Sequence, residues 1–306
     1  MQRKVITMPD RGADKERRLV ERIANLPLLP SVVARILALD PEDPGYFDRL
    51  VKLAEEDPNF AVRLLRVANA AASAPLKPIA TVRQAAIRVG ARESAGLVTS
   101  MSVSRVFVPR NVGQKNLWIH SLQVAVAART IAGLAPDGHV APDQAYLAGL
   151  LHDIGRFVMF EGASEDLDLV ETVAWDTPQS LLQAERSLLG YDHAHVGALV
   201  CRRWSLPEDL ADVAQHHHAY NGEADGGSTR ARSELRRIVQ MADLLSIRLM
   251  RSPEFADLEP AGLTAELAAH CARREWHSPP VPPSRLAPRV AAIRDESALL
   301  ARELFG

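Results

Sequence analysis

The stretch Tyr146-Leu-Ala-Gly-Leu-Leu-His-Asp-Ile-Gly-Arg156 predicts a buried helix that ends in a histidine–aspartate pair. Its apolar residues recur at the spacing of one helix face, and Gly155 is expected to stop the helix just beyond the pair. A carboxylate is rarely buried without a partner, so Asp153 needs a cation, a hydrogen-bond donor or a metal. An isolated pair of this kind is more often a solvated helix end, with His152 bonding the last carbonyls and Asp153 facing water. The rest of the chain decides between these interpretations.

The composition is that of a soluble globular protein. The chain has 306 residues, of which 47% are hydrophobic, 24% charged and 5% aromatic, a length that suggests about two domains. A net charge of -2 gives no electrostatic argument for a nucleic-acid or membrane partner. We find no uninterrupted apolar run of the ~20 residues that a membrane span needs. Cys201 and Cys271 form no CxxC motif, so the predicted location is the reducing cytoplasm.

Helical periodicity runs through the chain and no segment alternates as a strand does, which predicts an all-α fold. We divide the chain into a flexible tail (1–13), an N-terminal helical half (14–110), a second helical half (111–251) and a C-terminal helical extension (252–306). Helix N-caps are expected at Asp57, Thr81 and Asp192. A capping box over Ser205–Glu208, with Ser205 as the cap, is expected to start a helix that ends in three histidines. Residues 165–189 are also expected to be helical, and 223–228 to form a polar loop.

Seven residues of the second half have side chains that bind metals and fall at or near helix ends. They are His120, His152, Asp153, His193, His216, His217 and Asp243. Imidazoles combined with carboxylates suit Fe, Mn, Zn or Ni rather than Ca or Mg. Several helices of a bundle can supply enough ligands for two ions, with a carboxylate such as Asp153 bridging them.

Each of these residues also has a purely structural interpretation. His120 could be a hydrogen-bonded core histidine. The run His216–His218 could be a solvated helix end, where imidazolium interacts favourably with the helix dipole. Asp243 could pair with an arginine such as Arg202, Arg203 or Arg237. Only the seven residues taken together, in their order along the chain, favour a metal site over these separate explanations.

That order, with the motifs around it, resembles the HD phosphohydrolase superfamily, and within it the HD-GYP branch and the related HDOD domain. The HDOD pattern is carried by Leu26-Pro-Leu-Leu-Pro30, Asp57-Pro-Asn-Phe-Ala-Val-Arg-Leu-Leu-Arg-Val-Ala-Asn69, Thr81-Val-Arg-Gln-Ala-Ala-Ile-Arg-Val-Gly90, Asp192-His-Ala-His-Val-Gly197 and Trp204-Ser-Leu-Pro207. The resemblance covers about residues 19–250. It implies an HD-type helical bundle packed against an N-terminal helical subdomain, and a role in bacterial signal transduction.

The chain departs from the HD-GYP phosphodiesterases at several positions. In His216-His-His-Ala-Tyr-Asn-Gly222 the third histidine replaces a glutamate, and no Gly-Tyr-Pro follows. Arg156 stands where the relatives have lysine, and Asn116 where some have a third-metal glutamate. These differences argue against a site for three ions and against cleavage of cyclic dinucleotides.

Two functions remain open. The first is a signal-transduction output protein that binds signalling proteins or a nucleotide ligand and keeps the site for two ions. The second is a metal-dependent phosphohydrolase or phosphodiesterase acting on a nucleotide or cyclic nucleotide. In the second, Asp153 bridges the ions, Arg156 holds a phosphate oxygen, and His217 is a ligand or supports one.

Nucleic-acid binding is a weaker third possibility. The arginines Arg230, Arg232, Arg236 and Arg237 fall on one predicted helix and are expected to form its solvated face. No nucleic acid and no membrane is therefore expected among the partners.

Overall fold

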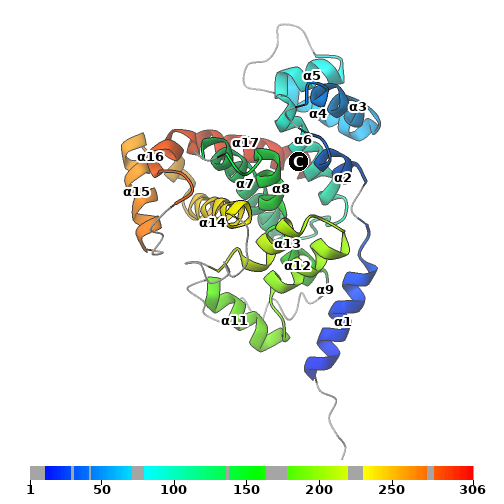
Figure 1. Ribbon diagram of the computed structural model, residues 1–306, viewed down its shortest axis with the longest axis vertical. Coiled ribbons are helices and arrows are strands. Elements are labelled where there is room, and N and C mark those ends of the chain that lie inside the picture. The colour runs from blue at the N-terminus through cyan, green and yellow to red at the C-terminus, as the bar shows by residue number, and fades with distance from the viewer. Residues whose placement is uncertain are drawn as a thin grey trace, which may run out of the picture.

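The computed structural model (Figure 1) describes residues 11–28, 31–40, 43–70, 79–135, 138–162, 178–219, 230–273 and 279–305. Every regular element in these ranges is a helix, which confirms the predicted all-α fold. Most of the predicted tail 1–13, residues 165–177 of the predicted helical stretch 165–189 and the polar loop 223–228 lie outside the described residues.

The N-terminal half contains the helices α1 (Arg11–Asn25), α2 (Ser31–Leu37), α3 (Tyr46–Glu55), α4 (Pro58–Ala70), α5 (Val82–Val89) and α6 (Ala91–Ser104). Two predicted caps are confirmed here. The Asp57 carboxylate accepts a hydrogen bond from the Asn59 amide at 2.9 Å, and the Thr81 hydroxyl accepts one from the Gln84 amide at 3.2 Å. These side chains satisfy amides that have no partner within the helix, and so fix where α4 and α5 begin.

The second half contains α7 (Val112–Leu134), α8 (Pro142–Leu151), α9 (Ile154–Gly162), α11 (Pro178–Leu189), α12 (His193–Arg203), α13 (Glu208–His216) and α14 (Arg230–Arg251). In Figure 1, α7, α8 and α14 occupy the centre of the molecule, with α3–α5 towards one end and α9 and α11–α13 towards the other. The predicted cap Asp192 is confirmed, because its carboxylate accepts from the His195 amide at 2.7 Å.

The central helix α7 is the one helix among the described ranges that is long and apolar enough to cross a membrane. Its most apolar window is 78% buried inside the protein, as expected for the core helix of a globular fold. This helix forms no uninterrupted apolar run in the sequence, because His120, Gln123 and Arg129 interrupt its apolar residues.

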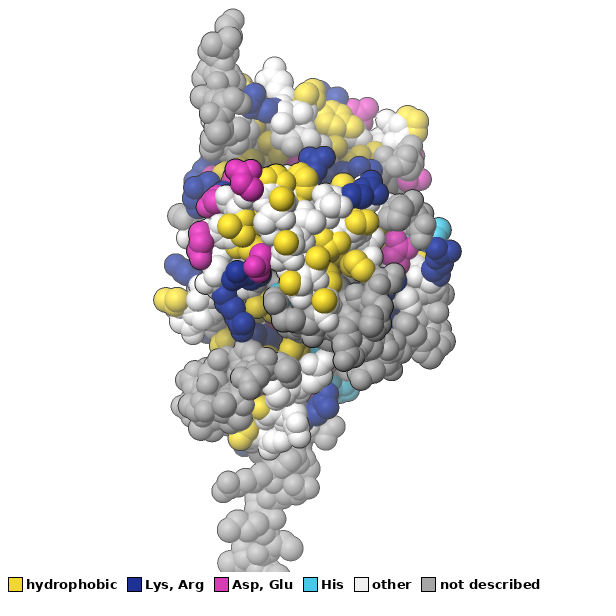
Figure 2. All heavy atoms as spheres, turned by 90° about the vertical axis from the view of Figure 1, so that its left-hand side faces the viewer, with side chains coloured by type: hydrophobic (Ala, Val, Ile, Leu, Met, Phe, Trp, Pro, Cys, Tyr) yellow, Lys and Arg dark blue, Asp and Glu magenta, His cyan; other side chains and the backbone are white. Residues whose placement is uncertain are grey.

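The C-terminal segment wraps back over the core through η1 (Pro253–Asp257), α15 (Pro260–Arg273), α16 (Pro283–Leu286), η2 (Ala287–Arg289) and α17 (Val290–Phe305). Helix α17 packs along α7 and also contacts α4 and α6, so it touches both halves of the chain. The buried guanidinium of Arg129 on α7 pairs with Glu296 on α17. Figure 2 shows the face that carries the C-terminal helices, where basic, acidic and apolar side chains are mixed.

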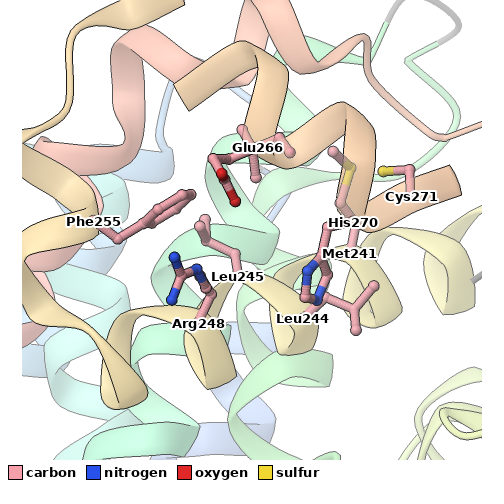
Figure 3. A pocket seen from close by; sticks show the side chains of 9 residues that line it. Met241, Leu244, Leu245, Arg248, Phe255, Glu266, His270 and Cys271 are labelled. Carbon is pink, nitrogen blue, oxygen red and sulfur yellow. The ribbon is translucent and has the colours of Figure 1, made fainter. Parts of the chain in front are cut away.

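A small apolar pocket separates α15 from α14 (Figure 3). The Arg248 guanidinium lies over the Phe255 ring there, 5.0 Å from its centroid. The pocket holds about 20 Å³, little more than one water molecule needs. It is therefore a packing gap between two helices.

Hydrogen bonds from side chains of the second half to backbone carbonyls hold the N-terminal segment in place. The Trp204 indole donates to the Pro27 carbonyl at 2.9 Å, and the Arg203 guanidinium donates to the Ala24 carbonyl at 3.2 Å. Through these bonds the end of α1 is held against the end of α12. The positions of the predicted domain boundaries stay a prediction.

Two local predictions are wrong. Gly155 does not stop a helix but lies in the first turn of α9, where a Cβ atom would fall 2.0 Å from the His193 carbonyl oxygen. It is glycine because α9 and α12 meet backbone to backbone. Ser205 does not cap α13, because it adopts φ 54° in the turn after α12, and α13 begins at Glu208 without a side-chain cap.

Candidate metal centre

Six of the seven predicted ligands meet inside the second half, together with one histidine that was not predicted. His120 comes from α7, His193 from the first turn of α12 and Asp243 from α14. His152 and Asp153 form the junction between α8 and α9, and His217 and His218 follow the end of α13. All seven are buried, with exposed fractions between 0% and 9%. Helix ends of four different elements and the middles of two others are therefore needed to assemble the cluster.

The cluster consists of two groups in which all potential ligand atoms lie within 4.8 Å of one another. The first group is His120, His152 and Asp243, and the second is Asp153, His193, His217 and His218. The separation is set by the helices that carry them, α7, α8 and α14 for the first group and α12 and α13 for most of the second.

The Asp153 carboxylate lies between the two groups. Its Oδ1 atom is 3.4 Å from Nε2 of His193 and 3.4 Å from Nε2 of His217. Its Oδ2 atom is 3.9 Å from Nε2 of His120 and 3.8 Å from Nε2 of His152. Each oxygen thus faces one group, which is the placement that a bridging carboxylate requires.

Hydrogen bonds behind the cluster turn the Nε2 atoms inwards. Nδ1 of His152 lies 2.8 Å from the Gly149 carbonyl, and Nδ1 of His217 lies 2.9 Å from the Ala214 carbonyl. Nδ1 of His120 lies 2.9 Å from the Ser246 hydroxyl, which itself donates to Gln123 and so accepts from the imidazole. When Nδ1 carries the proton in these bonds, Nε2 keeps its lone pair for a ligand.

His193 is oriented by a carboxylate that was missed in the sequence. Glu185 on α11 is fully buried and lies 2.7 Å from Nδ1 of His193, and it also accepts from the His193 backbone amide at 2.9 Å. A carboxylate–imidazole pair of this kind fixes the ring and increases the basicity of its other nitrogen. The glutamate lies eight residues before the histidine, on another helix, so no local spacing pointed to it.

The ionisation of the His152–Asp153 pair suits metal coordination. Burial, with the imidazoles of His217 and His120, lowers the pKa of His152 to about 4 against the opposing effect of Asp153. Burial alone would raise the pKa of Asp153, but neighbouring imidazoles, with His152 first, outweigh it and hold that pKa well below its usual value. A neutral imidazole beside an ionised carboxylate is the state in which both can act as ligands.

Several buried polar atoms of the cluster have no hydrogen-bond partner among the described residues. Oδ1 of Asp153, Nε2 of His217 and Oδ2 of Asp243 make no hydrogen bond with any described residue. Buried polar atoms are normally satisfied, and leaving them without partners is costly. Oxygen and nitrogen atoms that converge without protein partners fit bound transition metals.

His216 is the predicted ligand that the structure does not bring into the cluster. Its Nδ1 atom lies 3.1 Å from the Asp212 carbonyl and 3.2 Å from the Asp212 carboxylate, and its side chain is 38% exposed. His218 lies there instead, with Nε2 3.1 Å from Nε2 of His193. The signal was available in the sequence, because His217 continues the buried helix face of Val213 whereas His216 continues the face of Asp212.

The cluster opens into a cleft of about 610 Å³. His120, Asp153, His218 and Asp243 line its inner end. Its walls come from α7, α9, α11 and α14, and include the polar or charged residues Asn111, Asn116, Arg156 and Arg251 and the apolar residues Leu117, Phe160, Leu181, Ile247 and Met250. This volume falls within the range of sites that enclose small molecules and cofactors.

The chain is similar to two curated proteins in sequence and to a solved structure in fold. A 5'-deoxynucleotidase of Pasteurella multocida is 26% identical over 180 residues, which cover 58% of this chain and 80% of the enzyme. An uncharacterized protein of Treponema pallidum is 31% identical over 139 residues, 45% of this chain but only 26% of that longer protein. A solved structure from Shewanella amazonensis, provisionally described as a phosphohydrolase, superimposes with a TM-score of 0.68 at 23% identity, covering 94% of this chain and 97% of that one.

The family assignment follows from the matched segment. The family model of the HDOD domain matches residues 26–220, which include the predicted N-terminal motifs and all the histidines of the cluster. The resemblance seen in the sequence is confirmed, and the chain belongs to the HDOD domain family.

Proposed function

We propose that the chain is a metal-dependent phosphohydrolase that binds two divalent transition-metal ions in the cluster and acts on a phosphate ester of nucleotide size. The observation that carries the proposal is Asp153, whose two oxygens face two separate groups of ligand atoms. The relation to a 5'-deoxynucleotidase supports a nucleotide as the class of substrate.

The two groups of the cluster would each hold one ion. His120, His152 and Asp243 would hold one, and His193, His217 and His218 the other, with Asp153 shared between them. Three or four nitrogen and oxygen ligands suit Fe, Mn, Zn or Ni. When bound, a pair of such ions supplies an activated water and neutralises charge on the phosphate.

Arg156 would bind the phosphate. It follows Asp153 by one helical turn, its guanidinium lies 3.9 Å from Oδ2 of Asp153, and it lines the cleft. A guanidinium binds two phosphate oxygens at once and orients the ester for attack. The nucleoside part would then extend along the apolar wall that includes Phe160 and Leu181.

Metal analysis and a phosphatase assay on the full chain test the proposal together. Protein purified without chelators should contain Fe, Mn, Zn or Ni, and the loaded protein should release phosphate from nucleoside monophosphates. Protein that carries no such metal and takes up none of them contradicts it, and so does loaded protein that turns over no nucleotide.

Replacing Arg156 with methionine should lower kcat/KM for a nucleoside monophosphate about 100-fold, because the substituted side chain keeps the length but loses the charged hydrogen bonds to phosphate. The metal content should not change, since Arg156 is not a ligand. The control is Arg202→Met, which removes an exposed guanidinium paired with Glu208 and should leave kinetics unchanged. Equal activity of Arg156→Met and the wild type would remove Arg156 from the phosphate site.

Replacing Glu185 with glutamine should weaken binding of the ion held by His193 by about 10–100-fold. The amide cannot stabilise the ring as the buried carboxylate does, so the ring loses basicity. Competition with a metal-binding dye measures the affinity, and Glu208→Gln, at an exposed glutamate, is the matched control. Unchanged affinity for both ions in Glu185→Gln would show that this contact only packs α11 against α12.

Signal output through protein contacts or a bound nucleotide is the second candidate, favoured by the HDOD family and by the lack of Gly-Tyr-Pro after the histidines. It differs from the first in expecting bound metals without turnover. Cyclic dinucleotides serve as the discriminating substrate: we expect little or no cleavage of them. Multiple turnovers that disappear in Asp153→Ala would instead make the protein a cyclic-dinucleotide phosphodiesterase.

A further inference from the structure

A second cavity lies where helices from the two halves of the chain meet. It holds about 260 Å³ and is walled by α2, α6 and the N-terminal parts of α8 and α13. Helix α6 contacts both α2 and α8, and α8 contacts α13. Figure 1 shows α2 and α6 beside the upper part of α8. Arg92, Ala141 and Pro207 are exposed at its mouth, whereas Thr99 and Tyr146 are buried at its floor.

This cavity is separate from the metal cleft, because no residue lines both. It also differs from two further hollows between the described residues. The pocket in Figure 3 is too small for a ligand, and the hollow between α7 and α17 is spanned by the Arg129–Glu296 ion pair. The cavity between the two halves of the chain therefore needs its own explanation.

The lining indicates an uncharged ligand with polar edges. Arg92 and Asp143 are the charged residues among its lining, one of each sign, so neither a cation nor an anion finds an excess of opposite charge. Asp143 accepts a hydrogen bond from the Tyr46 hydroxyl at 3.3 Å, and the side chains of Gln144 and Thr99 add an amide and a hydroxyl. Between these polar groups the walls are apolar and include Ile36, Leu147 and Leu210. Apolar walls with a few polar groups suit a flat heterocycle that carries donors and acceptors at its edge.

Two helices connect the cavity to the metal centre. Helix α8 has Asp143 of its first turn at the cavity and His152 as its C-cap. Helix α13 has its N-cap Pro207 at the cavity and ends just before His217. Ten residues of α8 span about 15 Å. Because helices move as rigid units, a change in the spacing of their first turns is transmitted to their last turns.

We propose that this cavity binds an uncharged heterocyclic base and that its occupancy changes the metal affinity of the centre at the far ends of α8 and α13. A ligand between the first turns of the two helices shifts one against the other, and so alters the 3.4 Å approach of Asp153 to His217. Base binding stands on the cavity alone, while the coupling rests on the proposed metal centre. Linkage requires that metal loading change base affinity by the same factor.

Calorimetric titration of the full chain with adenine, hypoxanthine and uracil tests the binding. At least one base should bind, and Thr99→Val and Asp143→Asn should each weaken it by about fivefold to tenfold through a lost hydrogen bond. The controls are Thr130→Val and Asp48→Asn, which change the same groups away from the cavity, and both should bind the base like the wild type. Failure of all three bases to bind overturns the proposal, as does binding that is insensitive to Thr99→Val and Asp143→Asn but lost in Arg156→Met, which would place the base in the metal cleft.

Titration with manganese in the presence and absence of the bound base tests the coupling. The manganese affinity should change by about fivefold or more, and the base affinity should change by the same factor when manganese is present. An unchanged manganese affinity with base bound overturns the coupling. Absence of manganese binding in every condition would overturn the proposed function and with it the coupling, whereas base binding would still be measured on the metal-free protein.

Discussion

Replacing Asp153 with alanine is expected to remove both metal ions and to reduce phosphohydrolase activity to background. Each oxygen of this carboxylate faces one of the two ligand groups, so its loss takes a ligand from both ions at once. Asp153 also lies between 3.4 and 3.9 Å from the Nε2 atoms of four imidazoles, and without it two bound dications would lose charge compensation in a buried site. We expect a loss of at least about 1,000-fold in kcat, larger than for any other single ligand.

Elemental analysis and circular dichroism distinguish this effect from unfolding. The helical signal of Asp153→Ala should remain nearly that of the wild type, because no described hydrogen bond depends on Oδ1 of Asp153. The double replacement of His152 and Asp153 with alanine should likewise lose the metal and keep the helices. Asp209→Asn, at a partly exposed aspartate paired with Arg232, serves as the control and should keep metal and activity. A full complement of metal in Asp153→Ala would contradict the shared-ligand assignment.

Replacing Gly155 with alanine is expected to destabilise the protein by about 3 kcal/mol or more and to weaken metal binding as well. The added Cβ would lie 2.0 Å from the His193 carbonyl oxygen and 2.7 Å from the Gly197 amide nitrogen, and both are backbone atoms that cannot turn away. Helix α9 must therefore move from α12, and His193 moves with the backbone that carries it. Thermal unfolding should show a fall in Tm of about 5–10 °C.

Gly133→Ala provides the matched control. Gly133 lies in the last turn of α7, where an added Cβ would meet nothing within 4 Å. Alanine is favoured over glycine in helices by up to about 1 kcal/mol, so this variant should be neutral or slightly more stable. If the two variants have the same stability, the close approach of α9 and α12 is not what selects glycine at 155.

The helices could be predicted from the sequence where a single residue fixes a helix start. Asp57, Thr81 and Asp192 each bond an amide two or three residues later, and such contacts are local. The predictions for Gly155 and Ser205 were wrong for different reasons. The role of Gly155 depends on contact with a helix distant in the sequence, and that of Ser205 on the backbone conformation of a turn. A glycine that permits helix contact looks the same in sequence as a glycine that ends a helix. Ser205 matches a capping box in spacing but occupies a left-handed turn.

The candidate site was predicted as a set, with one error of register. Six of the predicted ligands come together, four of them at helix ends and two in the middles of α7 and α14. Within the triple histidine the choice depends on helix rotation, and 100° separates neighbours such as His216 and His217. Glu185 could not be identified at all, since its pairing with His193 depends on how α11 packs against α12.

The segment that identifies the family is shorter than the unit that must fold. The family match ends at residue 220, yet Asp243 lies on α14, and α17 covers the apolar helix α7. A fragment cut at the family boundaries would lack a ligand of the first group and leave part of α7 facing water, a surface that favours aggregation. Residues 230–273 and 279–305 are thus an integral part of the folded body that carries the candidate metal centre, and any functional dissection of this chain has to keep them.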